Sequence, residues 1–126
     1  MTNGQSIFES IGGFETMDKW IPAFYKRVGE HPLLIPIFPD DLSEVARKQY
    51  LFMTQFLGGP PIYNEERGHP RLRRRHLPFE ITPDRREAWL ECMHEAMIEA
   101  EIAEPYFSAI FERLSMTATH MMNTPE

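Results

Sequence analysis

The sequence predicts an all-α fold. Two observations carry this prediction: apolar residues recur at three- and four-residue steps in successive segments, and no segment alternates between apolar and polar residues as a strand would. Helix start and stop signals between those segments support the same prediction. The chain has 126 residues, 42% of them hydrophobic, which is enough for one core, so we expect residues 1–126 to form a single domain.

The first long helix is predicted between Phe14 and Val28. Its apolar stripe consists of Phe14, Met17, Ile21, Phe24, Tyr25 and Val28. Pro22 lies inside this segment and should kink the helix or delay its start. Pro32, Pro36 and Pro39 then interrupt the chain, so residues 33–38 are expected to form a short apolar corner that ends at Phe38.

A second helix is predicted to open at Asp41, because Glu44 follows three residues later and completes a capping box. Its stripe is Leu42, Val45, Gln49, Phe52, Met53 and Phe56. The run from Gly58 to Pro61 should stop this helix, and the stretch from there to Gly68 is rich in turn residues and is expected to be a loop.

The second half of the chain carries two further long helices and a short one. The short helix is expected from about Pro70 to Leu77, because Pro78 disfavours helical angles before it, and it places His76 in its last turn. Thr82-Pro83-Asp84 combines a capping side chain, a proline at the first helical position and an acid in the first turn. The stripe of that helix is Trp89, Leu90, Met93, Ala96, Met97 and Ala100. Another helix is expected from about Pro105.

Composition and charge exclude several classes of protein. No apolar run approaches the roughly 20 residues of a membrane helix. The net charge is -6, and basic residues gather only at Arg71, Arg73, Arg74 and Arg75, so nucleic acid is not an expected partner. The first residues lack the pattern of a secretory signal, and Cys92 is the single cysteine, so we expect a cytoplasmic protein without disulfides and a structural Cys92.

One histidine stands out as a candidate metal ligand. His76 ends a helix before a proline-stiffened corner, which would fix the orientation of its ring. A histidine that only caps the helix terminus is the plainer interpretation. The other four histidines lack close ligand spacing, so a zinc or di-iron site is poorly supported, and no nucleophile or phosphate-binding motif is present.

Three polar-tipped side chains interrupt otherwise apolar faces: Tyr25, Gln49 and Trp89. Burying a hydroxyl, an amide and an indole N–H costs free energy unless each finds a partner, so together they suggest donors that share a small ligand. Taken singly, each has another explanation: the two aromatic residues could reach backbone carbonyls in the core, and Gln49 could lie in water at the edge of its stripe. The abundant Met and Phe suit either a flat apolar cofactor or an ordinary core.

The chain resembles the truncated hemoglobins of the second group over about residues 7–123. The similarity rests on the order and spacing of several stretches, among them Ile11-Gly12-Gly13, Phe24-Tyr25-Lys26-Arg27-Val28, His31-Pro32-Leu33, Pro36-Ile37-Phe38-Pro39, Ala46-Arg47-Lys48-Gln49, Gly68-His69-Pro70, Arg75-His76-Leu77-Pro78-Phe79 and Ala88-Trp89-Leu90. The resemblance implies a globin-like, truncated two-over-two helical sandwich around heme b, an iron protoporphyrin IX.

The same resemblance implies roles for individual residues. His76 matches the proximal ligand of a five-coordinate heme iron, and Tyr25, Gln49 and Trp89 match the distal donors that face a bound diatomic ligand. Phe38 matches an aromatic residue that packs on the heme, and the propionate partners and further cofactor contacts are expected to be Arg75, Tyr63, Lys48, Val45, Phe52, Met53, Leu72, Phe79 and Met97.

Two residues depart from the family pattern. Val45 occupies the position of the distal gate and cannot donate a hydrogen bond, which leaves the polar contacts to the three distal donors and ligand entry less obstructed. Pro22 is not expected in the helix that carries Tyr25 and could shift that side chain.

Three functions stay open on the sequence. The first is a protein that binds or transports oxygen and also takes carbon monoxide or nitric oxide. The second is a redox enzyme, either a nitric oxide dioxygenase or peroxidase-like, and since the chain has no flavin or nicotinamide motif it would need a separate reductase. The third is a helical interaction protein without heme.

Overall fold

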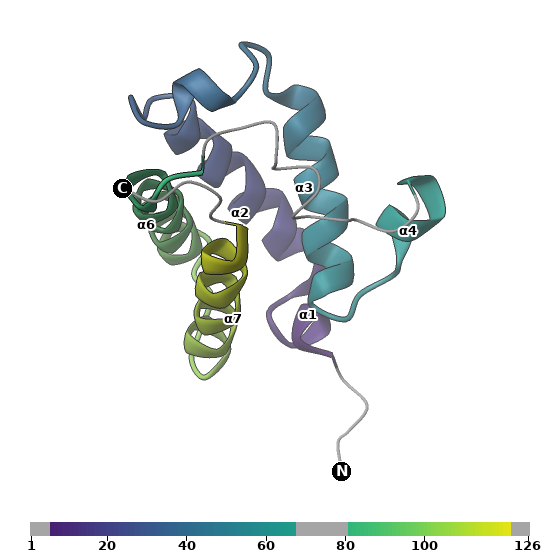
Figure 1. Cartoon of the computed structure of the whole chain (residues 1–126). Helices are drawn as coiled ribbons and strands as arrows, with labels where there is room; N and C mark the ends of the chain where they lie inside the picture. The colour runs from purple at the N-terminus through teal and green to yellow at the C-terminus, as the bar shows by residue number, and fades with distance from the viewer. Residues whose placement is uncertain (1–5, 68–80, 122–126) are drawn as a thin grey trace.

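The computed structural model describes residues 6–67 and 81–121, and every regular element within them is helical (Figure 1). The elements are α1 (Ile7–Ser10), α2 (Gly13–Val28), the 3-10 turn η1 (Ile35–Ile37), α3 (Ser43–Phe56), α4 (Ile62–Arg67), α6 (Pro83–Glu99) and α7 (Tyr106–Met121). The all-α prediction is confirmed, and the long helices α2, α3, α6 and α7 correspond to the four predicted long helices. The short helix predicted at 70–77 lies outside the described residues.

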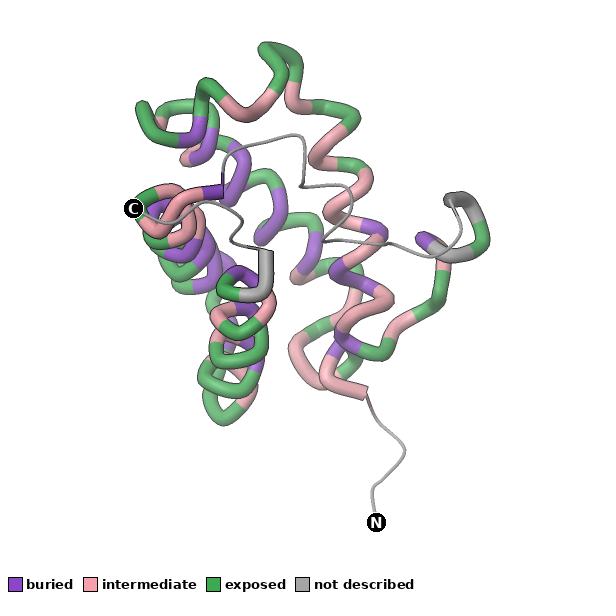
Figure 2. The backbone as a smooth tube through the Cα atoms, viewed as in Figure 1, coloured by how far each residue is buried: buried purple, intermediate pink, exposed green. Residues whose placement is uncertain are grey.

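Helix α2 lies at the centre of the fold. It packs against α6 on one side and α3 on another, while α7 packs on α6 and α4 on α3 (Figure 1). Buried residues follow α2 and the inner side of α6 (Figure 2). The completely enclosed side chains of these two helices are Met17, Trp20, Ile21, Phe24, Val28, Met93, Ala96 and Met97, which make α2 and α6 the middle of the core.

The helix starts follow side-chain chemistry, but not always at the predicted residue. Thr82 caps α6 by accepting a hydrogen bond from the Arg85 N–H at 3.2 Å, as predicted. The capping box predicted at Asp41 is wrong, because the Asp41 carboxylate instead accepts from the N–H of Ser43 at 3.0 Å and from its hydroxyl at 2.6 Å. This local turn satisfies Asp41 two residues onward, so α3 begins at Ser43.

The loop predicted before Gly68 is also wrong in part, since α4 occupies residues 62–67. Helix α3 ends before Gly58, and Pro60 and Pro61 lie directly before α4, where a residue needs no N–H for the helix. The Ile62 N–H donates to the Pro60 carbonyl at 2.8 Å, and the Glu65 N–H donates to the Pro61 carbonyl at 3.2 Å.

The segment before α4 fits tightly against α1. Gly58 adopts a φ of 90°, which favours glycine. A Cβ on Gly59 would lie 2.8 Å from the Phe8 ring and 2.9 Å from the Thr54 carbonyl oxygen. Close backbone approach therefore explains the glycine pair at the end of α3.

Helix α2 runs without interruption from Gly13 through Pro22 to Val28, so the predicted delay of its start is wrong. Pro22 lies on the exposed side of α2. A proline has no N–H, so the backbone hydrogen bond to the Asp18 carbonyl is absent at this turn. None of the helices in residues 6–67 and 81–121 is both long and apolar enough to cross a membrane.

Candidate functional site

An aromatic cluster joins three parts of the fold that the sequence analysis singled out. The Phe24 ring, completely buried, meets Tyr25 edge-on at a centroid distance of 4.8 Å and Trp89 edge-on at 5.3 Å. The Tyr25 ring also meets Phe38 edge-on at 6.2 Å. Phe24 therefore joins Tyr25 of α2 to Trp89 of α6, and Phe38 after η1 extends the cluster through Tyr25.

The Tyr25 hydroxyl, on a buried ring, is a donor without a hydrogen-bond partner among the described residues. The residue is 7% exposed, and its hydroxyl has no hydrogen bond within residues 6–67 and 81–121. Among the described residues, the only polar side-chain atom that is both fully enclosed and without a hydrogen bond is Thr54 Oγ1. The Tyr25 hydroxyl is therefore not fully enclosed. Burial raises the pKa of the Tyr25 phenol above its ordinary value, so the group stays a neutral donor at physiological pH.

Gln49 and Trp89 are half-buried, and neither side chain has a hydrogen bond to another described residue. Gln49 lies on α3 one turn after Val45 and one turn before Phe52, on the face that packs toward the core. No hydrogen bond joins Gln49 to Tyr25 or Trp89 in the described part of the chain. The structure thus brings two of the three predicted donors together through Phe24 and places the third on the neighbouring helix.

The other predicted contact residues fall into groups that differ in burial. Val45 and Phe52 are half-buried and pack against the core, and Lys48 is half-buried. Met53 and Met97 have no exposed surface, and Tyr63 on α4 is buried with its ring 5.9 Å from that of Phe52. The predicted residues that lie outside the described part of the chain are Leu72, Arg75, His76 and Phe79.

Sequence reasoning missed Trp20. The residue is completely buried, and its indole N–H donates to the Met93 sulfur at 3.1 Å. Its spacing gave a usable signal, since it lies three residues after Met17 and four before Phe24. Phe14, which the predicted stripe included, is 41% exposed and packs between Phe8 and Tyr50 at the edge of the fold.

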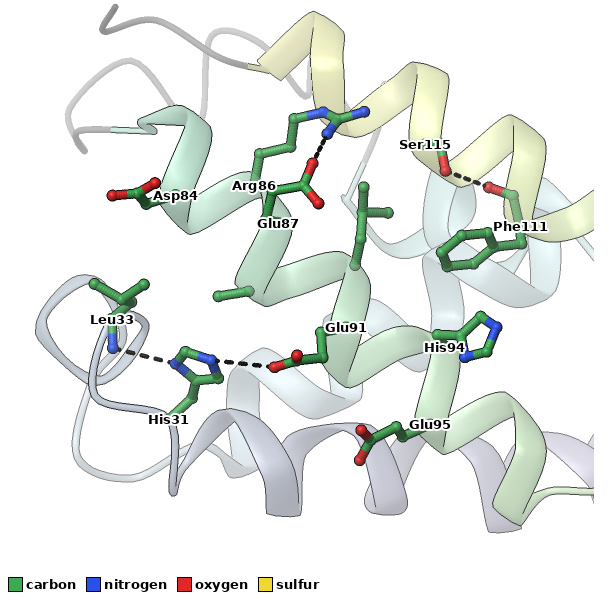
Figure 3. A pocket seen from close by; sticks show the side chains of 12 residues that line it. His31, Leu33, Asp84, Arg86, Glu87, Glu91, His94, Glu95, Phe111 and Ser115 are labelled. Atoms are coloured by element: carbon green, nitrogen blue, oxygen red, sulfur yellow. Dashed lines mark hydrogen bonds and ion pairs between the residues drawn. The ribbon is translucent and has the colours of Figure 1, made fainter. Parts of the chain in front are cut away.

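A separate shallow groove of about 700 Å³ lies between α6, α7 and the turn after α2 (Figure 3). It contains none of the predicted site residues. In it His31 accepts a hydrogen bond from the Leu33 N–H at 3.2 Å and lies 3.5 Å from a Glu91 carboxylate oxygen. Within the described residues, no group of three or more His, Cys, Asp or Glu side chains is arranged to hold a metal ion.

Comparison with known proteins places the chain in a family. The model of the bacterial-like globins matches residues 6–123. The group 2 truncated hemoglobin YjbI of Bacillus subtilis is 54% identical, over 98% of this chain and 95% of that protein. The crystal structure of the group II truncated hemoglobin of Bacillus anthracis matches with a TM-score of 0.97 at 54% identity, covering 99% of this chain and 96% of that one. This chain belongs to the group II truncated hemoglobins.

A further solved structure, the truncated oxygen-avid haemoglobin of Bacillus subtilis, matches this globin with a TM-score of 0.91 at 52% identity, covering 94% of this chain and all of that one. Membership in the globin family implies a heme cofactor and small diatomic ligands. The aromatic cluster fits such a group, because it offers apolar rings from three segments and a buried hydroxyl that the described residues leave without a partner. The resemblance seen in the sequence is thus confirmed at the level of family and fold.

Proposed function

We propose that this globin binds heme b through His76 and holds dioxygen, or another small diatomic ligand, with Tyr25, Gln49 and Trp89. The observation that carries the proposal is the Tyr25 hydroxyl, which is buried, neutral and without a hydrogen-bond partner among the described residues. The hydroxyl is not enclosed by the described residues, so it remains free to donate to a ligand that reaches this part of the core. The oxygen-avid relative gives independent support.

When bound, heme supplies an iron atom at which dioxygen takes on partial negative charge. The Tyr25 O–H, the Trp89 indole N–H and the Gln49 amide N–H can each donate toward that charge. The rings of Trp89 and Tyr25 both pack against Phe24. Binding a ligand should therefore cost these two donors little side-chain conformational entropy. Two such hydrogen bonds, at about 1–2 kcal/mol each, would slow oxygen release roughly 30- to 1000-fold.

The remaining predicted residues are assigned to the cofactor itself. Phe38, packed on Tyr25, would cover the heme near the corner that follows η1, and Val45 and Phe52 would contribute apolar surface from α3. Arg75, Lys48 and Tyr63 would pair with the propionates, since cations and hydroxyls are the usual partners of carboxylates. His76 must be neutral to bind iron.

The proposal also covers the location of this globin in the cell and its further ligands. We place the globin in the cytoplasm as an oxygen-binding protein, with carbon monoxide and nitric oxide as further ligands. Any redox cycle with many turnovers would depend on a separate reductase.

The substitution Trp89→Phe tests the assignment of the donors, because it keeps an aromatic ring against Phe24 and removes the indole N–H. Oxygen dissociation should become about 10-fold faster, which corresponds to one lost hydrogen bond. Carbon monoxide carries less charge when bound, so its release should change less. Stopped-flow measurement of both rates is the assay, and equal acceleration of the two would indicate steric gating in place of charge stabilisation.

A further inference from the structure

Trp20 and Met93 form a hydrogen bond in the middle of the core. Both side chains have no exposed surface, and the indole nitrogen of Trp20 lies 3.1 Å from the Met93 sulfur. Trp20 belongs to α2 and Met93 to α6, so the bond links the two helices that form the centre of the fold. A thioether is a weak acceptor, but the Met93 sulfur is the partner that satisfies the buried indole N–H of Trp20.

The bond lies one helical turn from the pair of predicted donors. Trp20 precedes Phe24 by four residues on α2, and Met93 follows Trp89 by four residues on α6. Residues four apart lie on the same face of a helix. The Trp20–Met93 bond and the Phe24–Trp89 ring contact are therefore successive contacts along one interface between α2 and α6.

The turn of α2 before Tyr25 has one backbone hydrogen bond fewer than a regular helix. Pro22 lies between Trp20 and Phe24 and removes a backbone hydrogen bond from this turn of the helix. The surrounding contacts are apolar, and apolar packing has no preferred direction, whereas a hydrogen bond selects particular atoms.

We propose that Trp20 and Met93 are positioning residues that fix the register of α2 against α6 and so set the separation of Tyr25 from Trp89. The inference rests on the function proposed above, since it concerns the placement of two donors of that site. Neither residue touches the ligand in this account, and both act through Phe24.

The variant Met93→Leu removes the acceptor and keeps a similar volume. Met17→Leu is the matched control, because Met17 is also a completely buried methionine and its sulfur accepts no hydrogen bond from a described residue. In the heme-loaded full chain, Met93→Leu should accelerate oxygen dissociation about five-fold and broaden or split the C–O stretching band of the carbon monoxide complex. Met17→Leu should change neither.

Two further measurements separate positioning from general destabilisation. Solvent exchange of the Trp20 indole proton, followed by NMR and assigned by its loss in Trp20→Phe, should become faster in Met93→Leu and stay slow in Met17→Leu. The double variant Trp20→Phe/Met93→Leu leaves no unpaired N–H, so its loss of thermal stability should be smaller than the sum of the losses in the two single variants. Its oxygen dissociation should stay fast, because the directional bond is still missing.

The proposal is overturned if Met93→Leu lowers thermal stability while oxygen dissociation and the C–O stretch stay as in the unmodified protein, or if the double variant recovers slow oxygen release. These results differ from a failure of the proposed function. If Tyr25→Phe and Trp89→Phe both leave oxygen release unchanged, the donors themselves are wrongly assigned and both proposals are wrong.

Discussion

The substitution Tyr25→Phe isolates one oxygen atom at the proposed site. Tyr25 is 7% exposed, its ring is held edge-on by Phe24 and Phe38, and phenylalanine can keep both ring contacts. The hydroxyl has no hydrogen-bond partner among the described residues, so removing it leaves none of them with an unsatisfied group. We therefore expect the free energy of unfolding to change little, since no hydrogen bond between described residues is lost.

The effect on the ligand, which the hydroxyl would hold by a hydrogen bond, should be larger. Such a hydrogen bond contributes about 1–2 kcal/mol, so its loss should accelerate oxygen dissociation roughly 5- to 30-fold. Carbon monoxide dissociation should change less, because a nearly neutral acceptor gains less from the same donor. Stopped-flow displacement gives both rates, and urea unfolding gives the stability.

Two results would refute this reasoning. A large loss of stability in Tyr25→Phe would mean that the hydroxyl has a structural partner, and an unchanged rate of oxygen release would mean that it does not face the ligand. The raised pKa of the phenol adds a check on the assignment, since oxygen release should not change with pH through ionisation of Tyr25 below about pH 10.

Three other predictions concern the fold and the cofactor. His76→Gly should abolish stable heme retention during gel filtration, and full retention would remove His76 as the iron ligand. Gly59→Ala should cost about 1–3 kcal/mol in urea unfolding, because the new Cβ would lie 2.8 Å from the Phe8 ring, whereas Gly29→Ala meets its nearest neighbours at 3.4 Å and should cost less. Burial raises the pKa of the Cys92 thiol to about 11, so the folded state holds that proton more tightly than the unfolded chain does. Relative to Cys92→Ala, stability should therefore fall as the pH rises from about 9 to about 11, and parallel stability curves would contradict the argument.

The helices could be predicted because their signals are local. The apolar spacing of α2 and the Thr82-Pro83 start of α6 depend on residues within one or two turns, and both predictions hold. The start of α3 was predicted at the wrong residue, and α4 was predicted to be a loop. Asp41 can accept from several nearby N–H groups, and Pro61 can end one helix or begin the next, so the local sequence is compatible with more than one arrangement.

The candidate site shows the same division. Polar tips on apolar stripes indicated Tyr25 and Trp89, and the structure brings both onto Phe24. The bond between Trp20 and Met93 joins residues 73 positions apart in the chain, and no local pattern pairs them. Which methionine faces an aromatic nitrogen is a property of how α2 crosses α6.

The most direct test of the central claim is an absorption spectrum of the purified full chain supplied with hemin, recorded ferric, then reduced, then with oxygen and with carbon monoxide. The account predicts a Soret band that shifts with reduction and again with each ligand. A spectrum that shows only free hemin, without these shifts, would contradict the proposal that this globin holds a gas-binding heme.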